Sequence, residues 1–209
     1  MLRRLSVALA AAVVAVALAV CAAAQSTTTA PMPLPRTATM LTEYGSIGIE
    51  LFGRAAPLNV AAFVRFARFG NFSAGSVSWY RYVTGPKAGD KFVLQGGINP
   101  NATCAHPVPI ENAQSNFKYT FGVARGDTVL SGSPDTAFFI NLRNNSEWLG
   151  PAGPGRKTAT THGYSVFGRV TSGFGVLSAM EVQPTHAVGG GGGDFFNKWI
   201  AIRRIIVHP

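Results

Sequence analysis

Thr-Glu-Tyr-Gly-Ser-Ile-Gly-Ile-Glu-Leu-Phe, residues 42–52, holds a turn signal between two apolar-rich runs. The runs cover residues 39–43 and 46–52, and Gly45 between them can adopt the positive φ that a tight turn often needs. This arrangement predicts a β-hairpin at the start of a folded domain.

A helix is predicted directly after the hairpin, over residues 56–69. Pro57 suits the first turn of a helix, where its missing N–H is not needed, and Gly70 can end the segment. Apolar residues recur between these two at helical spacing, namely Val60, Phe63, Val64 and Ala67. The segment is therefore predicted to form one amphipathic helix.

The rest of the chain reads as short strands separated by loops rich in Gly, Pro and Asn. The predicted strands are residues 78–83, 92–95, 119–124, 137–142, 164–170 and 199–207. A second, short helical pattern covers residues 175–180. Many short strands with two helices favour a mainly β fold: a closed or nearly closed antiparallel barrel capped by helices, with a β-sandwich as the alternative.

The N-terminus predicts an exported protein. Met-Leu-Arg-Arg is followed by an apolar run that ends in three alanines, which is the pattern of a cleavable signal peptide over residues 1–24. Residues 25–36 are rich in Ser, Thr, Ala and Pro without apolar periodicity, and this composition predicts a disordered linker. We therefore expect one folded domain at residues 37–209, with no stable membrane anchor after cleavage.

The composition argues against several classes of site. With Cys21 in the signal peptide, only Cys104 remains, so no internal disulfide can form. The formal net charge is +9, but the basic residues form no stripe with aromatic residues, and we expect no nucleic-acid binding. The four histidines lack metal-ligand spacing with each other or with Cys104. We therefore expect no metal site and no other cofactor.

Several later stretches, taken with the opening hairpin and helix, occur in the order typical of one family. They are residues 92–97 (Phe-Val-Leu-Gln-Gly-Gly), 110–112 (Ile-Glu-Asn), 137–141 (Ala-Phe-Phe-Ile-Asn), 147–149 (Glu-Trp-Leu) and 164–170 (Tyr-Ser-Val-Phe-Gly-Arg-Val). Over about residues 38–207 the chain resembles an exported cyclophilin-type peptidyl-prolyl cis/trans isomerase. Residues 182–186, Val-Gln-Pro-Thr-His, are especially similar to bacterial periplasmic members.

The resemblance implies a closed eight-stranded antiparallel β-barrel capped by two α-helices, with an outer groove that accepts a proline of a peptide. Arg81 would be the catalytic arginine, and Gln95 would bind the substrate backbone. The other implied groove residues are Phe92, Val93, Phe139 and Leu149 as walls, Trp148 at the rim, and Tyr164. We expect proline-containing polypeptides as partners and a monomeric chain.

Three departures from the family pattern keep a second function open. An insertion within residues 84–91 separates Arg81 from Phe92, Tyr80 replaces the usual His, and Ala137 replaces a Gln that helps to bind the peptide. The first hypothesis is an isomerase that assists the folding of exported proteins at X-Pro bonds. The alternative is a catalytically weak module that binds proline-containing peptides as a chaperone or scaffold.

The sequence leaves the compartment open between a bacterial periplasm and a eukaryotic secretory pathway or extracellular space. A third hypothesis is an unrelated exported barrel that holds an apolar ligand inside. A cyclophilin interior should instead be filled by side chains, and those expected to fill it are Ile49, Phe63, Phe121 and Val166.

Overall fold

The computed structural model describes residues 34–70, 72, 77–84, 91–98, 108–124, 137–151, 162–187 and 194–209. The strands within these ranges are β1 (Thr37–Thr42), β2 (Gly45–Leu51), β3 (Ser78–Thr84), β4 (Lys91–Ile98), β5 (Thr120–Val123), β6 (Phe138–Asn141), β7 (Val166–Ser172), β8 (Thr185–Ala187) and β9 (Asp194–His208). The helices are α2 (Pro57–Phe69), α3 (Ser146–Leu149) and α4 (Phe174–Glu181).

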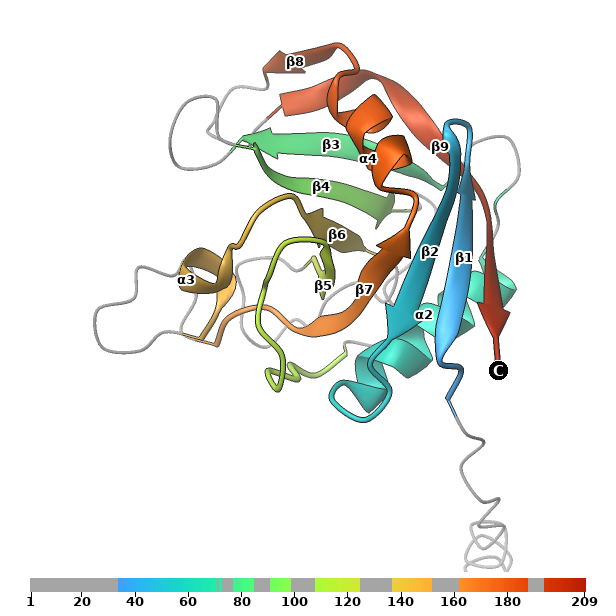
Figure 1. Ribbon diagram of the computed structural model, residues 1–209, viewed down its shortest axis with the longest axis vertical. Coiled ribbons are helices and arrows are strands. Elements are labelled where there is room, and N and C mark those ends of the chain that lie inside the picture. Colours follow the sequence, from blue (N-terminus) through green and yellow to red (C-terminus); the bar gives the residue numbers. More distant parts are fainter. Residues whose placement is uncertain are drawn as a thin grey trace, which may run out of the picture. The chain divides into compact units, whose positions relative to one another are not determined.

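Eight of the strands form a closed ring. They pair in the order β1-β2-β7-β5-β6-β4-β3-β9, and a further pairing between β1 and β9 completes the barrel (Figure 1). Every pairing is antiparallel. The predicted mainly β fold with a closed eight-stranded antiparallel barrel is therefore confirmed.

The predicted hairpin forms between β1 and β2, where Thr42 pairs with Gly45. Gly45 has a φ of +132°, a conformation that side-chain-bearing residues rarely adopt. The Thr42 hydroxyl donates to the Gly45 carbonyl over 2.8 Å and accepts from the Tyr44 N–H over 3.1 Å. One side chain thus satisfies two polar groups of the turn.

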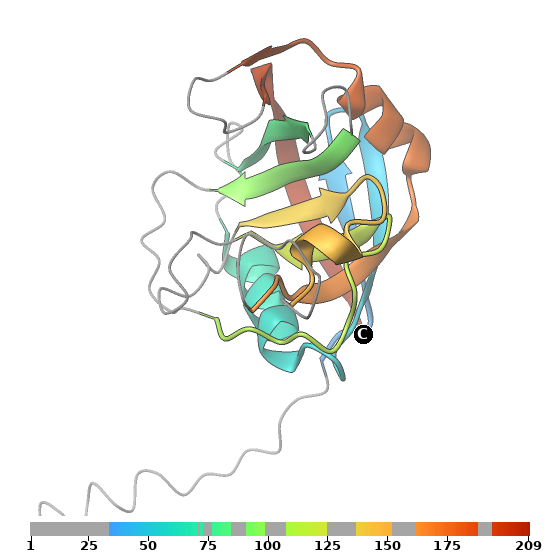
Figure 2. The same cartoon turned by 90° about the vertical axis from the view of Figure 1, so that its left-hand side faces the viewer.

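Helix α2 begins at Pro57, one residue after the predicted start, and a distant carboxylate completes its N-terminus. Glu111 accepts hydrogen bonds from the backbone N–H groups of Leu58, over 3.1 Å, and Asn59, over 2.9 Å. These N–H groups have no partner inside the helix, and the negative charge also suits the positive end of the helix dipole. Helices α2 and α4 lie at opposite ends of the barrel (Figures 1 and 2).

The structure adds two elements that the sequence patterns do not predict. Helix α3 is a single turn of four residues, too short to show helical periodicity. Strand β8 has three residues and pairs with the first residues of β9, outside the ring. Strand β9 accordingly starts at Asp194 and not at the predicted residue 199.

Aromatic side chains fill the barrel interior. The ring of Phe138 lies 5.1 Å from that of Trp79, 5.8 Å from Phe121 and 6.1 Å from Phe63, measured between centroids. Ile49, Phe63 and Phe121 belong to the main core, as predicted. Val166 is fully buried, as predicted, although it lies outside this cluster, in which its neighbour Phe167 packs.

The predicted signal peptide and most of the predicted linker, residues 1–33, lie outside the described residues, as do Cys104 and residues 85–90 of the insertion. At the end of the linker segment, Leu34 packs against the core, and the Arg36 carbonyl accepts a hydrogen bond from the Leu51 N–H over 2.8 Å. Among the described helices, none has the length and apolar character needed to span a membrane.

Candidate active site

Strand pairing brings Arg81, Gln95 and Phe139 into one row across the barrel wall. Arg81 on β3 pairs with Gln95 on β4, and Gln95 pairs in turn with Phe139 on β6. Phe139 pairs on its other side with Gly122 on β5. Residues that are far apart in the sequence thus lie side by side because the strands are in register.

A cavity of about 250 Å³ lies over this row. Its lining residues are Arg81, Val83, Phe92, Val93, Gln95, Ala124, Phe139, Leu149 and Tyr164. The structure therefore brings together every predicted groove residue except Trp148, which packs against the edge of the same apolar cluster. Their roles in binding and catalysis stay predictions.

Val83 and Ala124 line the cavity but were not predicted. Val83 lies two residues after Arg81, and Ala124 lies two residues after Gly122. Side chains two apart on extended backbone share one face, so the alternation along β3, and along β5 into the residue that follows it, was the signal that could have found them.

The apolar end of the cavity is a compact cluster separate from the main core. Val93, Phe139 and Leu149 are buried there, and the rings of Phe139 and Tyr164 meet edge to face, with centroids 5.9 Å apart. Phe138 points into the barrel and Phe139 into the cavity, as the alternation of side chains along a strand requires. The result is an apolar recess that suits a ring the size of proline.

Arg81 stands at the polar end of the cavity, next to an aromatic ring of β9. Its guanidinium carbon lies 5.3 Å from the centroid of Phe195, the residue with which Arg81 pairs on that strand. Stacking on a ring restrains a planar cation and leaves its N–H groups available at the edges. The Nε atom is buried and has no hydrogen-bond partner within the described part of the chain.

Tyr80 occupies the position where the resemblance implies a His. It lies at an irregularity between β3 and β4, where the register shifts between Trp79 and Arg81. Burial raises the pKa of the Tyr80 phenol to about 12, against smaller opposing effects of the Arg81 charge and of a hydrogen bond with Gln95. At neutral pH this phenol is therefore uncharged.

Ala137, the other departure, is buried in the apolar cluster with 5% of its surface exposed. A methyl group there offers no hydrogen bond to a peptide. Within the described ranges, no group of three or more His, Cys, Asp or Glu residues is placed to hold a metal ion.

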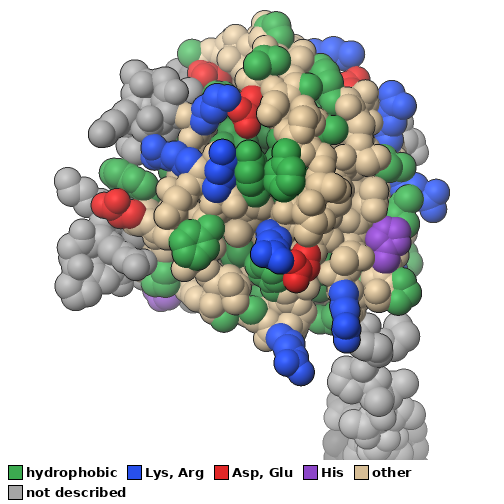
Figure 3. Space-filling view, in the orientation of Figure 1, with side chains coloured by type: hydrophobic (Ala, Val, Ile, Leu, Met, Phe, Trp, Pro, Cys, Tyr) green, Lys and Arg blue, Asp and Glu red, His purple; other side chains and the backbone are tan. Residues whose placement is uncertain are grey.

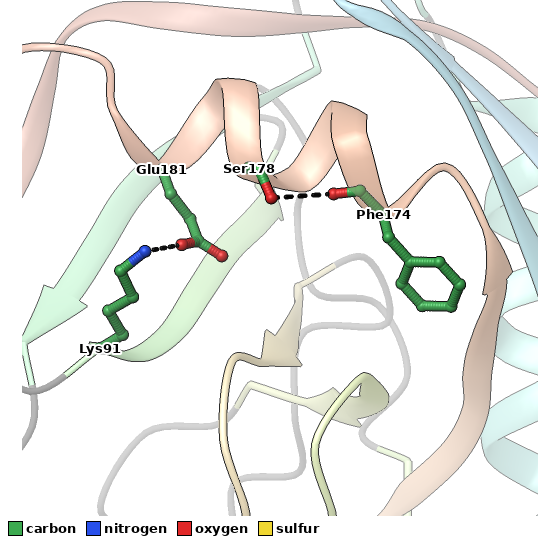
Figure 4. Close-up of polar contacts among 4 residues, drawn as sticks. All are labelled: Lys91, Phe174, Ser178 and Glu181. Atoms are coloured by element: carbon green, nitrogen blue, oxygen red, sulfur yellow. Dashed lines mark hydrogen bonds and ion pairs between the residues drawn. The ribbon is translucent and has the colours of Figure 1, made fainter.

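The surface around the barrel carries scattered charge. On the face shown in Figure 3, Lys and Arg side chains lie singly or in small groups among hydrophobic ones. One ion pair joins Lys91, at the start of β4, to Glu181, at the end of α4 (Figure 4). Lys91 directly precedes the groove residue Phe92, so this pair ties α4 to the strand that forms one wall.

A closed eight-stranded barrel with an arginine, a glutamine and an apolar recess on its outer wall is the architecture of the cyclophilins. The sequence profile described as "Cyclophilin type peptidyl-prolyl cis-trans isomerase/CLD" matches residues 37–206. The chain belongs to this family and is a cyclophilin-type peptidyl-prolyl cis/trans isomerase.

Relatives and solved structures agree with this assignment. The chain is 32% identical to a peptidyl-prolyl cis-trans isomerase of Acinetobacter baylyi over 162 residues, which cover 72% of this chain and 74% of the relative. It is also 32% identical to such an isomerase of Streptomyces antibioticus over 152 residues, covering 69% and 82%. A cyclophilin structure from Cryptosporidium parvum matches 84% of this chain and 98% of its own, with a TM-score of 0.62 and 17% identity, which supports the fold.

Proposed function

We propose that this chain isomerises X-Pro bonds of polypeptides in the groove over Arg81, Gln95 and Phe139 and assists the folding of exported proteins. The observation that carries the proposal is the row of these three side chains beside one cavity, with a cation at one end and apolar walls at the other. A structure of the Cryptosporidium parvum cyclophilin was determined in the presence of the dipeptide Ala-Pro.

The reaction rotates one bond and makes none. Rotation breaks amide resonance, at a barrier of about 18 to 20 kcal/mol, so neither a nucleophile nor a proton acceptor is needed. In the twisted transition state the proline nitrogen becomes pyramidal and regains its lone pair. A guanidinium N–H aimed at that nitrogen stabilises the transition state more than the planar ground state.

Each part of the groove has a place in this scheme. The apolar recess holds the pyrrolidine ring while the carbonyl side of the bond turns. Gln95 can donate to and accept from the substrate backbone without adding charge. Arg81 places a planar, charged guanidinium at the other end of the groove.

A protease-coupled assay on a short Ala-Pro peptide tests the proposal. The protease cleaves only the trans form, so an active isomerase shortens the slow phase that otherwise lasts tens to hundreds of seconds. We expect acceleration in proportion to the concentration of the purified chain. A slow phase unchanged at micromolar protein would contradict the proposed activity.

The second candidate is a weak isomerase that mainly binds proline-containing segments. Two features favour it: Ala137 lacks the amide implied at its position, and Tyr80 stands where the resemblance implies a His. In this case calorimetry would measure binding of the peptide while the coupled assay shows little acceleration.

Export is proposed from the N-terminal sequence pattern alone. If residues 1–24 are a cleaved signal peptide, the mature protein begins at Gln25 or within a few residues of it. Intact-mass measurement of the protein from the exported fraction tests this, and a mass that retains Met1 or Leu2 would exclude cleavage.

A further inference from the structure

Three buried asparagines lie together behind the groove. Asn116 is 1% exposed, and Asn141 and Asn145 are 0% exposed. They come from three places: the segment before β5, the end of β6, and the residue before α3. Three amide groups with almost no solvent contact require hydrogen-bond partners inside the protein.

The three side-chain amides are linked by hydrogen bonds in one series, in which an N–H group of one amide donates to the oxygen of the next. Arg143 Nε donates to Asn145 Oδ1 over 3.0 Å, and Asn145 Nδ2 donates to Asn141 Oδ1 over 2.8 Å. Asn141 Nδ2 donates in turn to Asn116 Oδ1 over 3.2 Å and to Thr120 Oγ1 over 2.9 Å. Turning one amide around would set donor against donor or acceptor against acceptor, so each amide holds its neighbours in place.

The remaining amide N–H groups of this series donate to backbone carbonyls of residues that line the groove. Asn145 Nδ2 donates to the Phe92 carbonyl over 2.9 Å. Asn116 Nδ2 donates to the carbonyls of Leu149 over 3.2 Å and of Tyr164 over 3.3 Å. With two hydrogens on each amide nitrogen, all of the donors that the three side chains offer are used.

The three tethered residues all line the cavity, yet they come from β4, the end of α3 and the segment before β7. Leu149 and Tyr164 lie outside the strands of the barrel, so the pairing of barrel strands does not hold them. The spacing between these walls and Phe92 therefore depends on contacts behind the groove.

We propose that Asn116, Asn141 and Asn145 are positioning residues that set the width of the proline recess. This inference rests on the proposed isomerase function of the groove. The asparagines do not reach the substrate: they act by fixing the backbone of Phe92, Leu149 and Tyr164. A wall displaced by a fraction of an ångström alters the fit of the pyrrolidine ring and the aim of the groups around it.

Asn116→Asp is the sharpest test. The new carboxylate keeps the size of the side chain and can still accept from Asn141, but it cannot donate to the two wall carbonyls. We expect the KM for an Ala-Pro peptide to rise and kcat/KM to fall by about tenfold or more. Calorimetry should show a matching rise in the Kd of the peptide.

Thr42→Val is the matched control. Thr42 is also buried and also bonds the backbone with its side chain, but in the β1–β2 turn, and it does not line the cavity. We expect it to lower the melting temperature and leave KM unchanged. A loss of folded protein alone lowers the apparent kcat without altering KM, so the KM separates positioning from a merely structural role.

Asn116→Ser is the second variant if Asn116→Asp fails to fold, because its short hydroxyl removes the two side-chain bonds to the wall carbonyls without burying a charge. A folded variant at position 116 with KM and kcat/KM within about twofold of the original chain would overturn the proposal. An original chain with no activity at all would overturn the proposed function and this inference together, whereas activity that is insensitive to position 116 overturns the inference alone.

Discussion

Arg81 is the residue on which the proposed catalysis depends. Replacing it with Ala removes an interaction made only in the transition state, and we expect kcat/KM to fall by about 30-fold to 1000-fold, or on the order of 2 to 4 kcal/mol. Arg81→Lys should also be poor, because an ammonium cannot reproduce the planar fork stacked on Phe195. The coupled assay measures both variants.

Arg203→Ala controls for loss of positive charge, since Arg203 is exposed on β9 and does not line the cavity. Its activity should match that of the original chain. Full activity in Arg81→Ala would show that another group stabilises the transition state.

The groove also requires a glycine at position 122, next to the ring of Phe139. A Cβ added at Gly122 would lie 2.2 Å from Cζ of Phe139, which is a severe overlap with a buried ring. We expect Gly122→Ala to push Phe139 into the proline recess, to lower kcat/KM by about tenfold, and to cost about 1 to 3 kcal/mol of stability. Kinetics and urea unfolding measure the two effects.

Gly175→Ala is the matched control for this glycine substitution. Gly175 lies in α4, and a Cβ there would meet nothing within 4 Å. Because Ala is the better helix former, we expect a gain of about 0.5 to 1 kcal/mol with activity unchanged. A Gly122→Ala variant as active as Gly175→Ala would mean that the Phe139 ring moves aside without narrowing the groove.

At the scale of elements, α4 is joined to β4 by the ion pair of Glu181 and Lys91 (Figure 4). The hydrogen bond and the charge of Glu181 raise the pKa of the Lys91 ammonium above its usual value. A raised pKa in the folded state means that this stabilisation is present below about pH 10.5, the unfolded value, and is lost as the pH rises through the folded value.

We expect Lys91→Met to lower the free energy of unfolding by only about 0.2 to 1 kcal/mol at pH 7, because the lysine is largely exposed to solvent. The difference from the original chain should shrink in high salt and vanish at high pH. Urea unfolding at two salt concentrations checks this, and a difference that does not depend on salt would assign the effect to packing of the lysine stem.

Local patterns predicted the elements that have strong periodicity or turn chemistry. In β2, Ile47, Ile49 and Leu51 are buried in alternation, and α2 begins and ends where Pro57 and Gly70 indicate. Local patterns could not predict β8 or the early start of β9, because those strands depend on pairing with each other and with β3. A three-residue strand carries too little periodicity of its own.

The groove walls were predicted by resemblance, and the structure brings them together, but what lies behind them was not predictable. Asn116 and Asn145 lie among other polar residues in irregular segments, and polar residues in a loop indicate a turn more often than a buried contact. Their place became visible only when strands and loops distant in the sequence were assembled. The same holds for Phe195, which meets Arg81 through the pairing of β9 with β3.

At the scale of the whole molecule, the first and last strands close the barrel. Strand β1 pairs with β9 from Thr37 opposite His208 to Thr42 opposite Ile202. Ile205 is 3% exposed and lies opposite Met40, which is fully buried. The ring is therefore complete only when the C-terminal end of the chain is in place, although no groove residue lies there.

A chain that ends at Arg204 tests how far the groove depends on closure. It loses Ile205 and the strand partners of the first four residues of β1, and it leaves an open edge on a barrel that has none. Loss of one buried isoleucine alone costs about 2 to 5 kcal/mol, a large share of the stability of a typical domain. We therefore expect the cooperative thermal transition and the isomerase activity to disappear together. A chain that ends at Val207 is the control, because within the β1–β9 pairing it loses only His208, which lies opposite Thr37 and hydrogen-bonds Thr39, and it should stay folded and active. If the chain ending at Arg204 melts cooperatively within a few degrees of the control, the other seven pairings of the ring and the two remaining β1–β9 pairs keep the barrel folded without full closure.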